Sequence, residues 1–234
     1  MSDLGRIALV GATGLVGRSV INAVIGHGDF RLVGIARREM PLPAGARMEL
    51  VVADPSQWGE VLHRQRPNVL ICALGTTWKR AGKDEEAFRA VDQELVLETA
   101  RAAVAAGIPH MVAISSVGAD RMSRNFYLRV KGETEAGLIK VGFKRIDILR
   151  PGLLRGSRSH DMRAGEGLAK IAAPLIDPLL RGKWRPYRSI QAMAVAEGAL
   201  ELATRKAAGR FFHDNDSIRR AARDWEKRAL VTEG

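Results

Sequence analysis

Short apolar runs alternate along this chain with longer segments of helical periodicity. The runs predict buried strands at 7–10, 31–36, 48–53, 68–73, 110–114, 144–149 and 210–213. Helices are expected between them, at 15–26, 54–66, 84–106 and 190–204. In the longest helix the apolar spacing predicts one buried face, made by Phe88, Val91, Leu95 and Thr99. Strands that are apolar on both sides and separated by helices predict an α/β fold with a doubly wound parallel sheet.

The pattern weakens after Pro151. Residues 152–190 are rich in Arg, Gly and Pro, and an apolar helix-like stretch at 168–180 is interrupted by prolines. The last segment, 216–234, is expected to be an exposed polar helix. We therefore expect a single domain over 1–234. Its parts are a core at 5–152, a small irregular substrate-side segment at 153–190 and a C-terminal helix and strand at 190–234.

Composition narrows the class of protein. The 234 residues carry 37 Lys and Arg against 26 Asp and Glu, a net charge of +11, but the excess is spread along the chain. With few aromatic residues among the basic ones, this favours a solvated surface with an anionic dinucleotide site over polyanion binding. Cys72 is the single cysteine, so no disulfide framework is expected, which suits a cytoplasmic location. We expect no membrane span, signal peptide, nucleic-acid partner or metal site.

The segment G-A-T-G-L-V-G at 11–17 lies between the first strand and the first helix. Gly11 allows a sharp turn, Gly14 allows the backbone to approach a pyrophosphate, and Gly17 allows close packing of helix on strand. The N–H groups that open the helix bind phosphate, with the positive end of its dipole. The expected dinucleotide contacts in this turn come from Gly11, Thr13, Gly14, Leu15 and Val16.

The end of the second strand indicates which nicotinamide cofactor is bound. A site for NAD usually presents a carboxylate there, whereas this chain has Arg37 and Arg38. Guanidinium groups suit the 2′-phosphate of NADP, although two solvated surface arginines are the alternative. Asp54 is expected to accept a hydrogen bond from the adenine amino group, to cap the helix ahead of Pro55, or both. Further contacts near the ribose are expected from Ala73, Leu74, Gly75 and Thr76.

A Y-x-x-x-K motif provides candidate chemistry. On a helix, Tyr127 and Lys131 lie on one face, and a lysine ammonium favours the phenolate form of a neighbouring tyrosine. Ser116 ends the fifth strand eleven residues before this tyrosine, so its hydroxyl is expected to share the substrate oxygen with Tyr127. The alternative is that Tyr127 and Lys131 share a helix face that has no catalytic role. Trp184 and Tyr187 either line the substrate side or anchor a loop.

The chain resembles the short-chain dehydrogenase/reductase superfamily, and more closely its atypical Tat-interacting oxidoreductase-like branch. The resemblance rests on the glycine turn and four further segments: C-A-L-G-T-T at 72–77, I-S-S-V-G-A-D at 114–120, Y-L-R-V-K-G-E-T-E at 127–135 and L-R-P-G at 149–152. It implies NADP(H) binding, with Tyr127 as the acid and base, Lys131 on the ribose and Ser116 polarising the substrate.

The resemblance also implies that Ser115 lies beside the nicotinamide and that Pro151 and Gly152 pass its carboxamide. One departure concerns Asp92, which replaces the asparagine of a proton relay found in many of these reductases. A buried carboxylate there behaves differently from an amide, or it faces a neighbouring arginine.

Two functions from different classes follow from these observations. The first is an NADP(H)-dependent oxidoreductase that moves hydride between the nicotinamide and a small carbonyl or alcohol substrate. The second is a non-catalytic NADPH-binding regulatory protein that engages a partner through a loop surface. A polyanion-binding protein is a third, weaker interpretation. The sequence leaves monomer and homodimer equally open.

Overall fold

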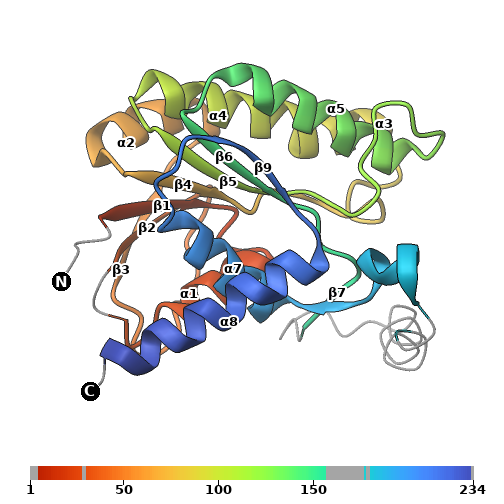
Figure 1. Ribbon diagram of the computed structural model, residues 1–234. Helices are drawn as coiled ribbons and strands as arrows, with labels where there is room; N and C mark the ends of the chain where they lie inside the picture. Colours follow the sequence, from red (N-terminus) through yellow and green to blue (C-terminus); the bar gives the residue numbers. More distant parts are fainter. Residues whose placement is uncertain (1–4, 28–29, 157–176, 178–179, 233–234) are drawn as a thin grey trace.

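The computed structural model describes residues 5–27, 30–156, 177 and 180–232. Its centre is a seven-stranded parallel sheet with the order β3-β2-β1-β4-β5-β6-β9 (Figure 1). The strands are β1 (Arg6–Val10), β2 (Arg31–Ala36), β3 (Met48–Val52), β4 (Val69–Cys72), β5 (His110–Ile114), β6 (Arg145–Leu149) and β9 (Gly209–His213). The strand order reverses between β1 and β4, and the carboxyl ends of such strands border a ligand crevice. The expected fold class is confirmed.

Helices cover both faces of the sheet (Figure 1). One layer contains α1 (Leu15–Ala23), α7 (Ala192–Ala203) and α8 (Asn215–Thr232). The other contains α2 (Trp58–Gln65), α4 (Leu95–Ala105) and α5 (Phe126–Val141). The shorter elements are η1 (Pro55–Gln57), α3 (Glu85–Arg89), η2 (Ala90–Glu94), β7 (Leu154–Arg155), η4 (Gly182–Tyr187) and β8 (Ile190–Gln191).

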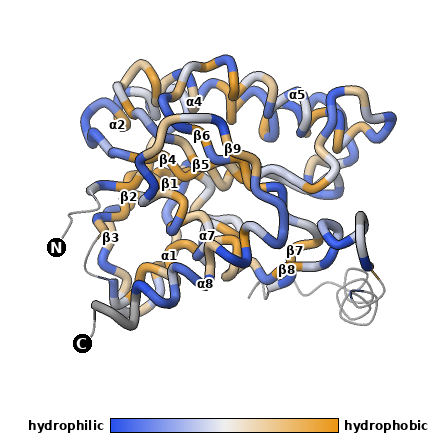
Figure 2. Tube along the Cα trace, in the orientation of Figure 1, coloured by the Kyte–Doolittle hydropathy of each residue, from blue (hydrophilic) through white to orange (hydrophobic). Residues whose placement is uncertain are grey.

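The central strands of the sheet are buried on both sides because most of their residues are apolar, whereas the edge strands β3 and β9 are only partly buried. In β1, Ile7 and Leu9 pack toward α1 and α7, whereas Ala8 and Val10 pack toward α2 and α4. Figure 2 shows apolar segments gathered in the strands, between two layers of helices of mixed polarity. This arrangement fixes the strands rigidly and leaves the loops at their carboxyl ends to form a site.

The helix expected at 84–106 is divided into α3, the π-helical segment η2 and α4. Phe88 and Thr99 are buried as expected, but Val91 and Leu95 are only half-buried and border a cleft. The wider π turn shifts the inward register, so Asp92 takes the inward position. This part of the predicted buried face is therefore wrong.

The expectation of an exposed polar helix at 216–234 is also wrong. Helix α8 packs against α7 and buries one side chain at nearly every turn, including Ile218, Ala221 and Trp225. The Trp225 ring lies 4.7 Å from the His27 ring and 5.2 Å from the Phe30 ring, between ring centroids. Charged residues outnumber apolar ones in this segment, and this composition conceals a narrow apolar face.

Two further predicted segments are the apolar stretch at 168–180 and the helix at 190–204. The apolar stretch expected at 168–180 lies almost wholly outside the described residues. The helix expected at 190–204 begins at Ala192, because Ile190 pairs with Leu154 in a small two-stranded sheet.

Among the described helices, none is long and apolar enough to cross a bilayer.

Candidate functional site

The glycine turn brings the ends of β1 and β4 together. Gly11 has φ +81°, and a Cβ there would fall 2.4 Å from the carbonyl carbon of Ala73. A Cβ on Gly17 would fall 2.2 Å from the Gly11 carbonyl oxygen, so helix α1 packs against the turn only with glycine at this position. Gly14 begins α1 without a side-chain cap, and no acidic residue occupies the first turn. The N-terminus of α1 therefore remains electrostatically suited to a phosphate.

A cleft of about 1460 Å³ opens above this turn. Its volume exceeds the roughly 300–1,000 Å³ of ordinary small-molecule pockets, as an extended ligand requires. Ten of the predicted cofactor residues line it: Gly11, Thr13, Gly14, Leu15, Arg37, Arg38, Ala73, Leu74, Gly75 and Thr76. The shape and the glycine cradle thus fit a dinucleotide.

The end of the cleft beside β2 is basic. Arg37 and Arg38 are exposed there, and Arg18 of α1 joins them in lining the cleft, whereas Glu39 is the carboxylate in the same stretch. Sequence reasoning missed Arg18, although its position four residues after Gly14 on a helix places it on the same side. Three guanidinium groups against one carboxylate give this end a positive balance.

Asp54 lies outside the residues that line the cleft. Its carboxylate accepts hydrogen bonds from the Ser56 amide at 3.0 Å and the Ser56 hydroxyl at 2.7 Å. These bonds hold the pKa of Asp54 below its usual value. The Gln57 side chain completes a capping box on the Asp54 amide. The geometry therefore matches the capping alternative for Asp54.

Five other predicted contacts also lie away from the cleft lining: Val16, Ser115, Lys131, Pro151 and Gly152. The Val16 side chain is buried in the core, which leaves only its backbone facing the turn. Pro151 is buried, and the Gly152 amide donates to Asn215 Oδ1 at 2.9 Å, at the start of α8. A Cβ on Gly152 would fall 2.1 Å from the Arg188 carbonyl oxygen. Gly152 is thus packed between η4 and α8.

Tyr127 and Lys131 lie one turn apart on α5, which begins after Asn125; its side chain accepts from the Leu128 amide at 3.1 Å. The Lys131 ammonium lies 6.0 Å from the centroid of the Tyr127 ring. That ring packs on Phe88, with 5.6 Å between centroids. The motif therefore forms the expected shared helix face, and Phe88 fixes the position of the tyrosine.

Asp92 connects this helix face to the cleft. Its Oδ1 forms an ion pair with Lys131 Nζ at 2.6 Å, and its Oδ2 accepts a hydrogen bond from the Thr76 amide at 2.6 Å. A Cβ on Gly75 would fall 3.4 Å from Asp92 Oδ1, so the β4 loop passes directly over the pair. Of the two alternatives for Asp92, the structure shows the buried carboxylate, and its charged partner is Lys131 rather than an arginine.

Lys131 and Asp92 are both almost completely buried. Burial alone would lower the pKa of Lys131, but the charges of Asp92 and Tyr127 raise it above its usual value. Lys131 therefore remains a cation beneath Tyr127. Cys72, at the end of β4 near this pair, has a pKa raised to about 11 by burial and is an unreactive thiol.

The two serines after β5 have different surroundings. The Ser115 hydroxyl donates to Glu135 Oε1 at 2.5 Å, and Arg150 forms an ion pair with the same buried carboxylate. The Ser116 hydroxyl has a longer contact, 3.3 Å, with the Val117 carbonyl oxygen. Within the described chain, no hydrogen bond joins Ser116 to Tyr127 or Lys131. Ser115 is thus engaged by Glu135, and Ser116 is the more available hydroxyl.

The chain matches the sequence pattern of the NAD(P)H-binding family over residues 11–168, which includes the glycine turn, β4 and the Tyr127 helix. The chain belongs to the NAD(P)H-binding family. The expected NAD(P)-binding Rossmann family is confirmed.

Curated relatives of this NAD(P)H-binding protein carry the name Fmp52. The Emericella nidulans "Protein fmp52, mitochondrial" is 33% identical over 208 residues, covering 85% of this chain and 88% of its own. The Saccharomyces cerevisiae "Protein FMP52, mitochondrial" is 37% identical over 162 residues, covering 68% and 70%. The chain therefore also belongs to the Fmp52 family. The word mitochondrial in these names overturns our cytoplasmic expectation, since a lone cysteine does not identify a compartment.

Solved structures share the fold. The oxidoreductase ylbE from Lactococcus lactis has a TM-score of 0.64 and 18% identity, over 95% of this chain and 97% of its own. The Bordetella bronchiseptica enzyme WbmG in complex with NAD has a TM-score of 0.66 and 14% identity, over 96% and 78%. The NAD(P)H-binding family and these neighbours agree on a dinucleotide-binding Rossmann-like fold.

Proposed function

We propose that this protein is an NADP(H)-dependent oxidoreductase that transfers hydride between the nicotinamide and a small carbonyl or alcohol. The observation that carries the proposal is the position of the buried Lys131 cation. It lies beneath the Tyr127 ring and is ion-paired to Asp92, which holds the cleft-lining Thr76 amide. An acid–base candidate and a dinucleotide cleft are thereby joined through one buried contact.

The NAD(P)H-binding family includes binders of NAD and of NADP. The choice of NADP rests on the positive charge at one end of the cleft. Arg18, Arg37 and Arg38 line the cleft end next to β2, where the adenosine ribose of a dinucleotide lies in this fold. Guanidinium groups bind a 2′-phosphate through paired, charge-assisted hydrogen bonds. Glu39 alone offers the carboxylate that NAD would require.

In the reducing direction, NADPH held in this cleft would supply the hydride for the carbonyl carbon. The Tyr127 hydroxyl donates its proton to the carbonyl oxygen, so an alcohol forms and a phenolate remains until solvent reprotonates it. The Lys131 cation stabilises that phenolate. The Ser116 hydroxyl donates a hydrogen bond to the same substrate oxygen. Ser115 is not assigned this role, because its hydroxyl donates to Glu135, which is ion-paired with Arg150.

The test is consumption of NADPH with a panel of small aldehydes and ketones. Tyr127→Phe should lower turnover by about a hundredfold or more, because positioned proton transfer contributes roughly 10²–10⁴-fold. The chain contains one other tyrosine, so Tyr187→Phe is the matched control and should retain turnover. NADPH affinity should be nearly unchanged in both variants. Equal turnover in wild type and Tyr127→Phe would contradict the mechanism.

A second function is favoured by the same ion pair. Asp92 compensates the charge of Lys131, which weakens its effect on a neighbouring phenolate. A regulatory protein that binds NADPH without turnover would tolerate this arrangement. NADPH binding without turnover on the whole panel, together with capture of a partner only when NADPH is present, would establish that function in place of the enzyme.

A further inference from the structure

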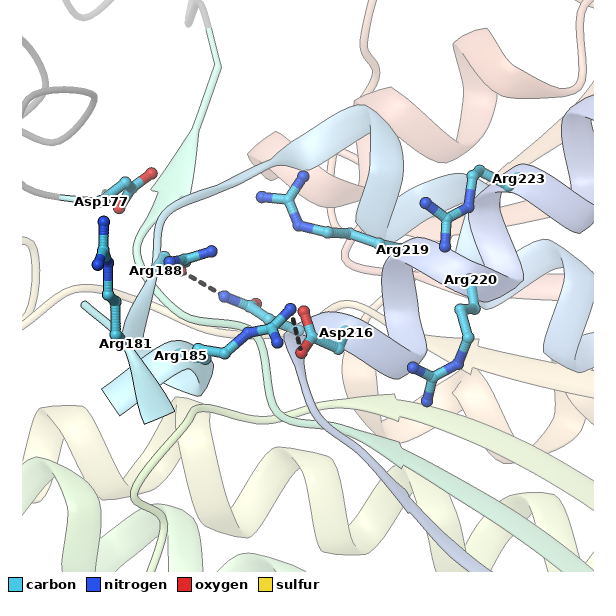
Figure 3. Close-up of a pocket in the computed structure, with 9 residues that line it drawn as sticks. Asp177, Arg181, Arg185, Arg188, Asp216, Arg219, Arg220 and Arg223 are labelled. Carbon is cyan, nitrogen blue, oxygen red and sulfur yellow. Dashed lines mark hydrogen bonds and ion pairs between the residues drawn. The ribbon is translucent and has the colours of Figure 1, made fainter. Parts of the chain in front are cut away.

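A second cavity, of about 860 Å³, lies between η4 and the first turns of α8 (Figure 3). Its walls are dominated by guanidinium groups rather than by apolar side chains. Six arginines line it, three from the η4 region and three from α8: Arg181, Arg185, Arg188, Arg219, Arg220 and Arg223. We call this the arginine pocket.

Two carboxylates also line the arginine pocket, so six positive charges face two negative ones. Asp216 forms an ion pair with Arg185 at 3.2 Å. Asp177 is engaged elsewhere, because its carboxylate accepts from the Ser189 amide at 2.8 Å and from the Ser189 hydroxyl. The pocket therefore keeps an excess of four positive charges, since guanidinium groups do not lose their proton in proteins.

The other arginines of the pocket contact neutral oxygens or are exposed. Arg188 Nε donates to the Leu180 carbonyl at 2.8 Å, Arg219 to the Ser189 carbonyl at 2.8 Å, and Arg220 to the Ser217 hydroxyl at 2.9 Å. Arg181 and Arg223 are exposed, and the Arg181 guanidinium points toward Asp177 (Figure 3). Within the described chain, Arg185 is the pocket arginine that has a carboxylate partner.

Three buried or half-buried arginines elsewhere in the molecule have carboxylate partners. Arg145, Arg150 and Arg89 are each paired with a carboxylate, at Asp147, Glu135 and Glu133. Carboxylates thus compensate these three guanidinium groups. Gathering five others around a cavity without such an ion-pair partner among the described residues costs Coulomb energy. An anion that enters the cavity would relieve this repulsion.

From this geometry we infer that the arginine pocket binds a ligand carrying two or more phosphate groups. Guanidinium forks match phosphate oxygens, and paired charge-assisted hydrogen bonds make such contacts strong. The arginines come from both walls of a cavity of about 860 Å³, so neighbouring phosphates can contact η4 and α8 together. Either a soluble polyphosphate or the headgroup of a phosphorylated lipid supplies this chemistry.

The arginine pocket is separate from the cofactor cleft, and the two share no lining residue. Helix η4 connects the pocket to the reaction side, because Tyr187 Oη would lie 3.6 Å from a Cβ on Gly118. A ligand that holds Arg185 and Arg188 would therefore also fix the element that packs beside the loop after Ser116. The inference does not depend on whether the protein turns over NADPH.

The experiment measures binding of tripolyphosphate to the full-length protein by calorimetry, at low and at physiological salt. The pocket variant is Arg181→Gln/Arg220→Gln/Arg223→Gln, chosen from the three exposed arginines with at most a local side-chain contact. The control is Arg31→Gln/Arg101→Gln/Arg210→Gln, which removes the same charge from exposed positions outside both cavities. Thermal unfolding and NADPH affinity are measured for each protein.

We expect wild type and the control to bind tripolyphosphate with similar affinity, and the pocket variant to bind roughly tenfold or more weakly. Salt should weaken binding, since these charges are solvent-exposed. NADPH should not compete with the probe.

In a second arm, vesicles containing phosphatidylinositol bisphosphate are compared with phosphatidylserine vesicles of equal charge. If wild type prefers the bisphosphate vesicles and the pocket variant does not, the ligand is a lipid headgroup. If wild type binds tripolyphosphate but shows no preference for the bisphosphate vesicles, the ligand is a soluble polyphosphate.

Three results would overturn the inference. The first is equal tripolyphosphate affinity in the pocket variant and the control. The second is displacement of the probe by NADPH, which would assign it to the cofactor cleft. The third is binding of a single-stranded RNA oligonucleotide, lost in the pocket variant, without binding of tripolyphosphate or of bisphosphate vesicles. That pattern would make the pocket part of a nucleic-acid surface.

Discussion

At the residue scale, the contact that most changes the view of this molecule is the ion pair between Asp92 and Lys131. The sequence identified Lys131 through its fixed spacing from Tyr127, because a helix converts that spacing into a shared face. The same reasoning could not find the partner of Asp92, which belongs to another helix. Pairing of side chains distant in sequence is decided by packing, and packing is absent from a local pattern.

Replacing Asp92 by Asn should leave the buried Lys131 without a counter-charge. The free energy of unfolding should fall by roughly 3 kcal/mol, because removing one partner of a buried pair leaves an uncompensated charge. Glu94→Gln, on the exposed side of the same helical stretch, is the control and should change it little. Urea unfolding near neutral pH measures both. A stable Asp92→Asn protein would show that the pair carries little of the stability.

The pH dependence of this pair has a defined sign. The pKa of Lys131 is raised in the folded protein above its ordinary value of 10.5. Its contribution to stability is therefore complete below that value and is lost as the pH rises through the folded pKa. The difference between wild type and Asp92→Asn should accordingly persist through neutral pH and narrow only in strong alkali.

The arginines at the end of β2 give the second prediction at this scale. Arg37→Gln/Arg38→Gln should weaken NADPH binding by roughly tenfold or more and leave NADH binding nearly unchanged, since only NADPH carries the 2′-phosphate. Arg31→Gln/Arg101→Gln removes equal charge away from the cleft and should alter neither affinity. Fluorescence titration with both cofactors measures this. If NADH binding is weakened to the same extent, the two arginines support the structure of the cleft rather than bind the 2′-phosphate.

At the element scale, the periodicity of apolar residues predicted the bounds of helices and strands better than it predicted which helix residues face the core. Helix α8 has an apolar stripe of single residues among many charges, and a reading of mean polarity missed it. The π segment η2 could not be predicted, because it is stabilised by tertiary contacts such as Asp92 with Thr76 and Lys131. The glycine turn was predictable because its requirement is local.

Docking of α8 depends most on Trp225, which is 2% exposed and packs beside His27 and Phe30. Trp225→Ala should lower the free energy of unfolding by about 3–5 kcal/mol, as expected for a large buried aromatic side chain. Lys227→Ala, on the exposed side of the same helix, is the control and should lie within about 0.5 kcal/mol of wild type. Loss below about 1 kcal/mol in Trp225→Ala would contradict tight docking of α8.

At the scale of the whole molecule, a buried polar network ties the edge strand β9 to the sheet. Asp147 on β6 is fully buried and accepts hydrogen bonds from Arg145, from His110 of β5 and from His213 of β9. The His110 and His213 bonds are each 2.8 Å long. The sequence predicted these strands but not the network, because its members meet only once the strands are in register.

This network predicts an acid-sensitive fold. Although burial raises the pKa of Asp147, the three hydrogen-bond donors hold it well below its ordinary value of 3.8. Its contribution to stability is complete above that value and is lost as the pH falls below it. Asp147→Asn should cost roughly 3–5 kcal/mol at about pH 7 and less at about pH 3, where this carboxylate takes up a proton in the unfolded chain while it stays ionised in the folded protein.

Urea unfolding at both pH values measures the Asp147 effect. Glu94→Gln makes the same carboxyl-to-amide change at the surface and should show neither the cost nor its pH dependence. An Asp147→Asn cost that is as large in acid as at neutral pH would assign the effect to packing rather than to charge.

The central claim, hydride transfer at Tyr127 beside the dinucleotide cleft, is tested most directly by isotope transfer. NADPH carrying deuterium at the transferring position of C4 is mixed with the carbonyl panel, and the products are analysed by mass spectrometry. We predict an alcohol labelled on its carbon with wild type and with Tyr187→Phe, and almost none with Tyr127→Phe. Absence of labelled alcohol from every carbonyl, or equal labelling with Tyr127→Phe, would contradict the account.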